Sequence, residues 1–84
     1  MRKIKIGIIT HYYDKIGVAI IKLGKTLKKD QELEFKDKQG EVIFTQVVDS
    51  IEIERKAVDQ AKKGDDVGIK VDQPTKPGWG VYSS

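Results

Sequence analysis

The chain has 84 residues, of which 38% are hydrophobic and 35% charged, a balance typical of a folded globular protein rather than a disordered one. It contains no cysteine, which excludes disulfides and thiolate metal sites and fits a reducing compartment, so we expect a cytoplasmic protein. No stretch approaches the ~20 apolar residues of a membrane span. The basic, apolar N-terminus lacks the small-residue cleavage site of a signal peptide. We therefore expect a single domain over residues 1–84 with no membrane partner.

The net charge of +3 is unevenly distributed along the chain. Residues 1–29 hold eight basic residues and one acid, whereas residues 30–84 hold eight basic and twelve acidic residues. A positive N-terminal third attracts phosphate groups or an acidic protein. Alternatively, these lysines lie on the solvent side of strands and protect sheet edges against aggregation. The charge pattern alone leaves both interpretations open.

Short apolar runs with a period of two predict strands through the first half of the chain. We expect strands over residues 3–13, 18–23, 32–35 and 42–44, with a charged turn at 27–30. The alternation slips at Ile8-Ile9, which indicates a bulge or a second buried face. Gly17 closes the first turn with a positive φ, and Gly40 ends a hairpin turn.

The stretch from Phe44 to Val71 carries the strongest strand signal. Val47, Ile51 and Ile53 share one parity, and we expect all three to belong to one strand. After the turn at Gly64, we expect Val67 and Ile69 to face the core, while Gly68 allows close backbone approach. After a proline-stiffened turn over residues 72–78, residues 79–82 form a closing strand.

The segment over residues 54–63 is ambiguous. Ala57, Val58 and Ala61 have helical spacing, and the composition favours a helix. Ten residues are few for a helix between strands, so we expect one or two helical turns, or an irregular loop with Val58 and Ala61 inward. Six or seven short strands with glycine-rich turns predict an all-β fold, a small closed antiparallel β-barrel.

Several groups of residues form a recognisable pattern. They are Val48-Asp49-Ser50-Ile51-Glu52, then Arg55-Lys56 with Asp59 and Ala61, then Gly64-Asp65-Asp66-Val67-Gly68-Ile69, preceded by Gly17-Val18-Ala19-Ile20 and by Leu27-Lys28-Lys29-Asp30 with Leu33. This pattern resembles the second domain of the translational GTPases, the β-barrel of elongation factor Tu and its relatives. Asp30 stands where that family has glycine. The resemblance implies a stand-alone, non-catalytic translation-factor-like barrel that binds tRNA or ribosomal RNA, near the loop that joins the first two strands.

Aromatic and basic residues gather in and around that region. The candidate RNA-binding residues are Lys3, Lys5, His11, Tyr12, Tyr13 and Lys15. Rings stack on bases, worth about 1–3 kcal/mol per base, while cations meet phosphates. Because adjacent strand residues point to opposite faces, at most one of the two tyrosines belongs to such a surface.

No residue set indicates catalysis, a metal, a cofactor or a nucleotide. His11 is the single histidine and has no nearby partner that identifies a nucleophile. Residues 19–26 fit a permissive phosphate-loop pattern, but they read as an apolar strand rather than as a loop before a helix. Asp65 and Asp66 are better explained as turn acids than as metal ligands. We therefore expect a protein that is not an enzyme and has no cofactor.

The sequence leaves two functions open. The first is RNA binding in a translation-related role, with RNA or the ribosome as partner. The alternative is a protein-interaction module that docks on a peptidase or another enzyme. That alternative is motivated by the missing catalytic domain and the acidic later portion. Similar barrels occur as accessory domains on other proteins, including collagenase-like peptidases, so the fold alone does not decide between the two functions.

Overall fold

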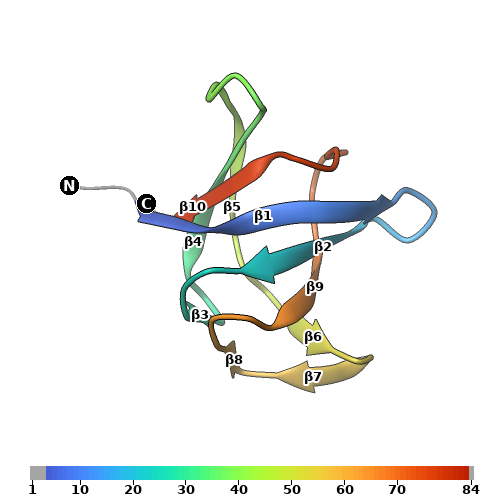
Figure 1. Ribbon diagram of the computed structural model, residues 1–84. Helices are drawn as coiled ribbons and strands as arrows, with labels where there is room; N and C mark the ends of the chain where they lie inside the picture. The colour runs from blue at the N-terminus through green and yellow to red at the C-terminus, as the bar shows by residue number, and fades with distance from the viewer. Residues whose placement is uncertain (1–3, 84) are drawn as a thin grey trace.

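The computed structural model describes residues 4–83, which form strands and turns only (Figure 1). The ten strands are β1 (Ile4–Tyr13), β2 (Val18–Leu23), β3 (Leu27–Lys28), β4 (Glu32–Lys36), β5 (Val42–Val47), β6 (Ile51–Ile53), β7 (Lys56–Val58), β8 (Gln60–Ala61), β9 (Asp66–Lys70) and β10 (Gly80–Ser83). Within this part of the chain, no helix is long and apolar enough to cross a membrane.

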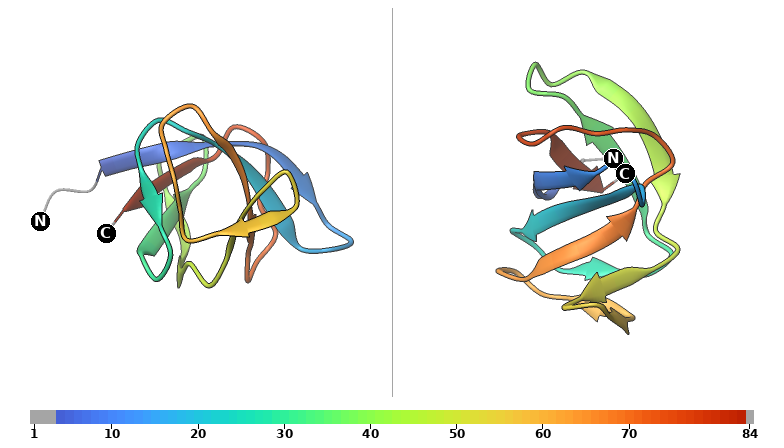
Figure 2. Two further views of the ribbon diagram at one scale, coloured as in Figure 1. Left: turned by 90° about the horizontal axis from the view of Figure 1, so that it is seen from below. Right: turned by 90° about the vertical axis from the view of Figure 1, so that its right-hand side faces the viewer.

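Eight of the strands form one sheet in the order β5-β4-β10-β1-β2-β9-β6-β7, and neighbouring strands in it pair antiparallel. The sheet curls around the core (Figure 2). Its two end strands, β5 and β7, are not paired with each other in residues 4–83. The expected all-β antiparallel fold is confirmed, but the expected closed barrel is wrong. The two-residue strands β3 and β8 pair with each other as a separate ladder instead of joining the two edges.

Strand β1 changes register twice along its length. It shifts against β10 between Lys5 and Gly7, and against β2 between Ile9 and His11. These bulges turn Ile6 and Ile9 toward the core and leave Ile8 41% exposed. The slip in the apolar pattern at Ile8-Ile9 is therefore an irregularity of pairing. A Cβ on Gly7 would collide with the carbonyl oxygen of Lys22, so the close approach of β1 to β2 at this point requires glycine.

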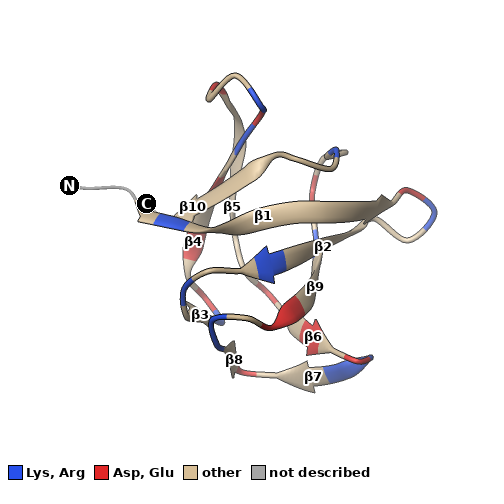
Figure 3. Cartoon of the chain, in the orientation of Figure 1, with Lys and Arg blue, Asp and Glu red and all other residues tan. Residues whose placement is uncertain are grey.

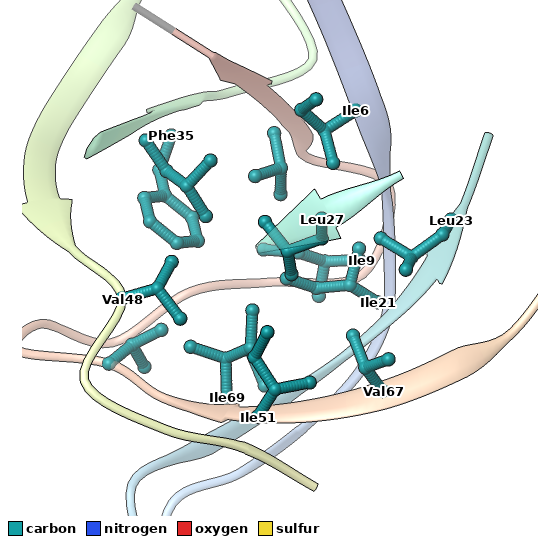
Figure 4. Packing of buried hydrophobic residues seen from close by; sticks show 14 of the residues in the cluster. Ile6, Ile9, Ile21, Leu23, Leu27, Phe35, Val48, Ile51, Val67 and Ile69 are labelled. Carbon is teal, nitrogen blue, oxygen red and sulfur yellow. The ribbon is translucent and has the colours of Figure 1, made fainter. Parts of the chain in front are cut away.

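The core lies inside the curl of the sheet (Figure 4). The rings of Phe35 and Phe44 stack with centroids 4.5 Å apart, and Ile9, Ile21 and Ile69 are buried around them. Removing each such side chain from water contributes about 1.5–3 kcal/mol. Val67, Ile69 and Ile51 all face this core, as their spacing predicts.

The region from Val47 to Ile53 is not one strand. Strand β5 ends at Val47, which is 47% exposed, whereas Val48 is fully buried. The amide of Val48 donates to the Gln31 carbonyl (2.9 Å), and its carbonyl accepts from the Asp30 amide (2.8 Å). The chain changes direction here, so the prediction that Val47 belongs to one strand with Ile51 and Ile53 is wrong.

The segment over residues 54–63 contains no helix. It completes the β6–β7 hairpin and then forms β8. The hairpin turn consists of Glu54 and Arg55, whose φ angles are +52° and +67°. Ala61 is buried and Val58 packs against the core, so the expected inward residues are confirmed while the helical alternative is wrong.

Candidate functional site

The β1–β2 hairpin extends past the rest of the sheet and ends in a turn over residues 14–17 (Figure 1). Gly17 adopts a φ of +66° there, and its amide donates to the Tyr13 carbonyl (2.8 Å). The Gly17 carbonyl accepts from the amide of Val71 (2.9 Å), just after β9. The hairpin tip is therefore fixed to the sheet at its base rather than suspended in solvent.

The aromatic residues at the end of β1 divide between the two faces of the hairpin. Tyr12 packs against the core, whereas Tyr13 is 50% exposed on the outer face. The imidazole of His11 stacks with the Tyr13 ring at 6.3 Å between centroids and 6° between planes. The Nδ1 atom of His11 also lies 3.2 Å from the hydroxyl of Thr10. The outer face thus carries a pair of parallel rings, made by His11 and Tyr13.

The candidate lysines lie at opposite ends of the hairpin. Lys15 belongs to the tip, two residues beyond Tyr13. Lys5 starts β1, roughly 25 Å from Tyr13 along an extended strand, and with Lys22 it lines a separate hollow of about 480 Å³. Lys3 lies outside the described residues. The structure therefore stacks His11 on Tyr13 on the outer face, turns Tyr12 toward the core, and leaves Lys5 at the far end of β1. RNA binding by the six candidate residues stays a prediction.

A groove of about 610 Å³ lies between the hairpin tip and the β6–β7 turn. Tyr13, Ile16, Val18 and Ile20 contribute its apolar side from β1, β2 and their turn. The opposite side comes from β6, the β6–β7 turn and β9, and consists of Glu52, Glu54, Arg55, Asp66 and Gly68. Sequence reasoning missed this groove. Its one visible signal was Ile16, a large apolar residue in a turn, which is 62% exposed.

The groove and the lysine-rich end of the molecule differ in charge (Figure 3). Lysines gather around the paired strands β3 and β8 and the loops beside them, at positions 25, 28, 29, 62 and 63. The groove instead holds the carboxylates of Glu52, Glu54 and Asp66, with Arg55 as its one cation. Lysines outnumber acids around β3 and β8, where Asp30, Asp59 and Asp65 also lie, whereas carboxylates outnumber cations among the residues that line the groove.

The remaining candidate chemistry is structural in the described part of the chain. The phosphate-loop-like segment contains most of strand β2, and the amides of Leu23 and Gly24 already donate to the carbonyls of Asp65 (2.9 Å) and Ile6 (2.7 Å). Asp65 accepts from the Lys62 amide (2.9 Å) as a turn acid. Residues 4–83 contain no group of three or more His, Asp or Glu side chains arranged to hold a metal ion.

Comparison with known proteins places similar chains among peptidases. No family model matches the chain. It is 37% identical over 81 residues to an uncharacterized protease of Methanocaldococcus jannaschii, covering 96% of this chain and 20% of that protein. The chain thus spans about a fifth of the length of the curated relative that it matches.

Two crystal structures share the fold. Both are of the C-terminal domain of a protein from Geobacillus thermoleovorans that is assigned to the U32 peptidases, and one of them is a selenomethionine variant. The variant has a TM-score of 0.84 and 26% identity, covering 92% of this chain and 95% of that domain. The other has a TM-score of 0.86 and 26% identity, covering 99% and 93%.

These similarities correct the resemblance to elongation factor Tu and the translation role that it implied. The residues that carried the resemblance, such as Gly17, Gly64 and Gly68, serve turns and close packing. Any small, strongly curved antiparallel sheet needs glycines at such places, so they identify an architecture and not a family. The similarity in sequence and in fold points instead to the C-terminal domain of a U32 peptidase.

Proposed function

We propose that residues 1–84 form one non-catalytic protein-interaction domain, which associates with the catalytic part of a U32-type peptidase. That part lies either in the same polypeptide or in a separate one. The observation that supports this proposal is the pattern of coverage. Nearly the whole chain matches a protease, yet it corresponds to only 20% of that protease, and the solved relatives are C-terminal domains. The peptide-cleaving residues then lie in the remaining part of such a protein.

The outer face of the β1–β2 hairpin supports an interaction role. Ile16 and Tyr13 expose 62% and 50% of their surface at the tip, and both line the groove. Large apolar side chains gathered on one face of a small domain are characteristic of protein contacts, and tyrosine is enriched at the centres of interfaces. The comparisons offer no support for RNA or the ribosome as partner. RNA contact at Lys3, Lys5, His11, Tyr12, Tyr13 and Lys15 remains a prediction from the sequence.

Reconstitution in trans tests this proposal. The protease of M. jannaschii is prepared without the segment that this chain matches, and its folding is verified by circular dichroism. Sedimentation velocity of this shortened protease mixed with the chain should reveal a stoichiometric complex at micromolar concentrations. The complex should persist after nuclease treatment. If the shortened protease is folded and sediments separately from the chain, the proposal is contradicted. The lysine pair Lys62→Gln/Lys63→Gln, which lies outside the groove, serves as a control expected to bind normally.

A further inference from the structure

The groove beside the hairpin tip has walls from two distant parts of the sequence. The turn after β1 supplies Ile16 on one side, and the β6–β7 turn supplies Glu54 and Arg55 on the other. Both turns lie toward the same side of the molecule (Figures 1 and 2). Because the Gly17 carbonyl binds the amide of Val71, the first wall is held in place relative to β9. The groove is therefore a preformed feature of the sheet.

The floor of the groove is apolar and is kept open by a glycine. Val18 and Ile20 of β2 pair with Lys70 and Gly68 of β9. A Cβ at Gly68 would lie 3.3 Å from Cγ1 of Val18 and 3.6 Å from Cδ1 of Ile20. A methyl group there would thus crowd Val18 and touch Ile20, so the glycine keeps this part of the floor free of a side chain of its own. An apolar side chain of a partner can lie over Gly68 and contact Val18 and Ile20 from outside.

The rim of the groove is acidic and is not neutralised from within the described chain. Glu52, Glu54 and Asp66 line it, and no ion pair engages these carboxylates in residues 4–83. Arg55 is the one cation among the lining residues, and Lys22 and Lys70 border the groove as the cross-strand neighbours of Asp66 and Val18. Unpaired carboxylates around an apolar floor are complementary to an apolar side chain flanked by lysine or arginine. Arg55 offers several N–H donors, which suit the carbonyl groups of an extended segment.

Two of the three non-glycine residues with a positive φ in residues 4–83 lie on the same rim, and the third, Asp30, lies elsewhere. Glu54 and Arg55 both adopt positive φ angles, +52° and +67°, in a turn between paired residues Ile53 and Lys56. A two-residue turn of this kind strongly prefers asparagine followed by glycine, because other residues are strained there. Strained positions of this kind cluster at binding sites.

We propose that this groove receives an extended, basic and apolar segment of the peptidase part, with one apolar side chain over Gly68 and flanking cations beside Glu52 and Asp66. This inference rests on the proposed function and names the chemistry of the contact. The lysine-rich end of the molecule would repel such a segment, so the charge pattern selects the groove over that surface.

A direct test uses two synthetic peptides of equal length, one alternating lysine with leucine and one alternating glutamate with leucine. In a residue-resolved NMR titration, the basic peptide should shift the amide signals of Val18, Ile20 and Gly68, and the shifts should weaken as salt is raised. The acidic peptide should leave these signals unchanged. Shifts centred on β3 and β8, equal responses to both peptides, or no response to the basic peptide would overturn the inference.

Paired variants separate this inference from the proposed function. Glu52→Gln/Asp66→Asn should weaken both the basic peptide and the reconstituted protease complex by about fivefold or more, because two rim charges are lost. Glu41→Gln/Asp59→Asn removes the same charge from outside the groove and should bind normally. If both variants form the complex equally well, the groove is not the binding site, while the docking proposal still holds. Failure of the wild-type chain to form any complex would contradict the docking proposal itself.

Discussion

The two hairpins beside the groove follow opposite local rules. The turn between β1 and β2 places a glycine, Gly17, at the position that needs a positive φ. The turn between β6 and β7 places Glu54 and Arg55 at two such positions. The residue at the positive-φ position of the first turn is the glycine that such a position favours, whereas the residues of the second turn are not ones that favour a positive φ. Departures from local preference in an otherwise consistent fold are expected at functional sites, and here the departure lines the groove.

The largest expected effect concerns the core that supports both hairpins. Phe35 is fully buried and stacks on Phe44, so Phe35→Ala should lower the free energy of unfolding by about 3–5 kcal/mol. Urea denaturation followed by circular dichroism measures this loss. The stability of the fold would not depend on this core if Phe35→Ala cost no more than truncation of the exposed Ile16.

Relief of strain at the second hairpin should have the opposite sign. Replacing the turn by Glu54→Asn/Arg55→Gly should raise the free energy of unfolding by about 1–2 kcal/mol, because both new residues tolerate a positive φ. The shift in the urea midpoint measures this gain. Lys15→Asn/Ile16→Gly at the first hairpin is the matched control, and it should give no gain because neither residue has a positive φ. An equal rise in the free energy of unfolding for both variants would show that the β6–β7 turn is no more strained than the β1–β2 turn.

The first hairpin should respond to the reverse change. Gly17→Ala forces a Cβ into the left-handed region and should lower the free energy of unfolding by about 1 kcal/mol. Open space surrounds this position, with only the Val71 carbonyl oxygen at 3.9 Å, so the loss reports backbone strain and not a clash. Thermal unfolding measures it, and an unchanged midpoint would show that the turn does not depend on glycine.

The smallest expected effect on stability is at the hairpin tip. Ile16 is 62% exposed, so Ile16→Ser should change the free energy of unfolding by less than about 0.5 kcal/mol. The same substitution should weaken the reconstituted protease complex, because it removes apolar surface from one wall of the groove. A large loss of stability in urea would mean that Ile16 serves the fold instead of an interface.

Much of the fold follows from local sequence signals. The bounds of β2, the inward positions of Val67 and Ile69, and the turns at Gly17 and Gly40 all agree with the pattern of apolar residues and glycines. These features depend on neighbouring residues, which a single sequence displays directly. Whether the two end strands of a sheet pair with each other depends on residues far apart in the sequence, and no local signal displays it. For this reason the sheet was expected to close into a barrel.

The errors arise where distant contacts override local preference. Glu54 and Arg55 favour a helix, yet pairing of β6 with both β7 and β9 holds them in a hairpin turn. The groove was missed for the same reason, since its walls are more than thirty residues apart in sequence and meet only through the sheet.

The affinity of the Glu54→Asn/Arg55→Gly chain for the shortened M. jannaschii protease, measured beside that of the wild-type chain, tests the groove most directly. If the strained turn is retained for binding, the variant should bind about fivefold more weakly or worse, even though its fold is more stable. A variant that is more stable and binds as tightly as the wild-type chain would contradict the assignment of this turn to the interface.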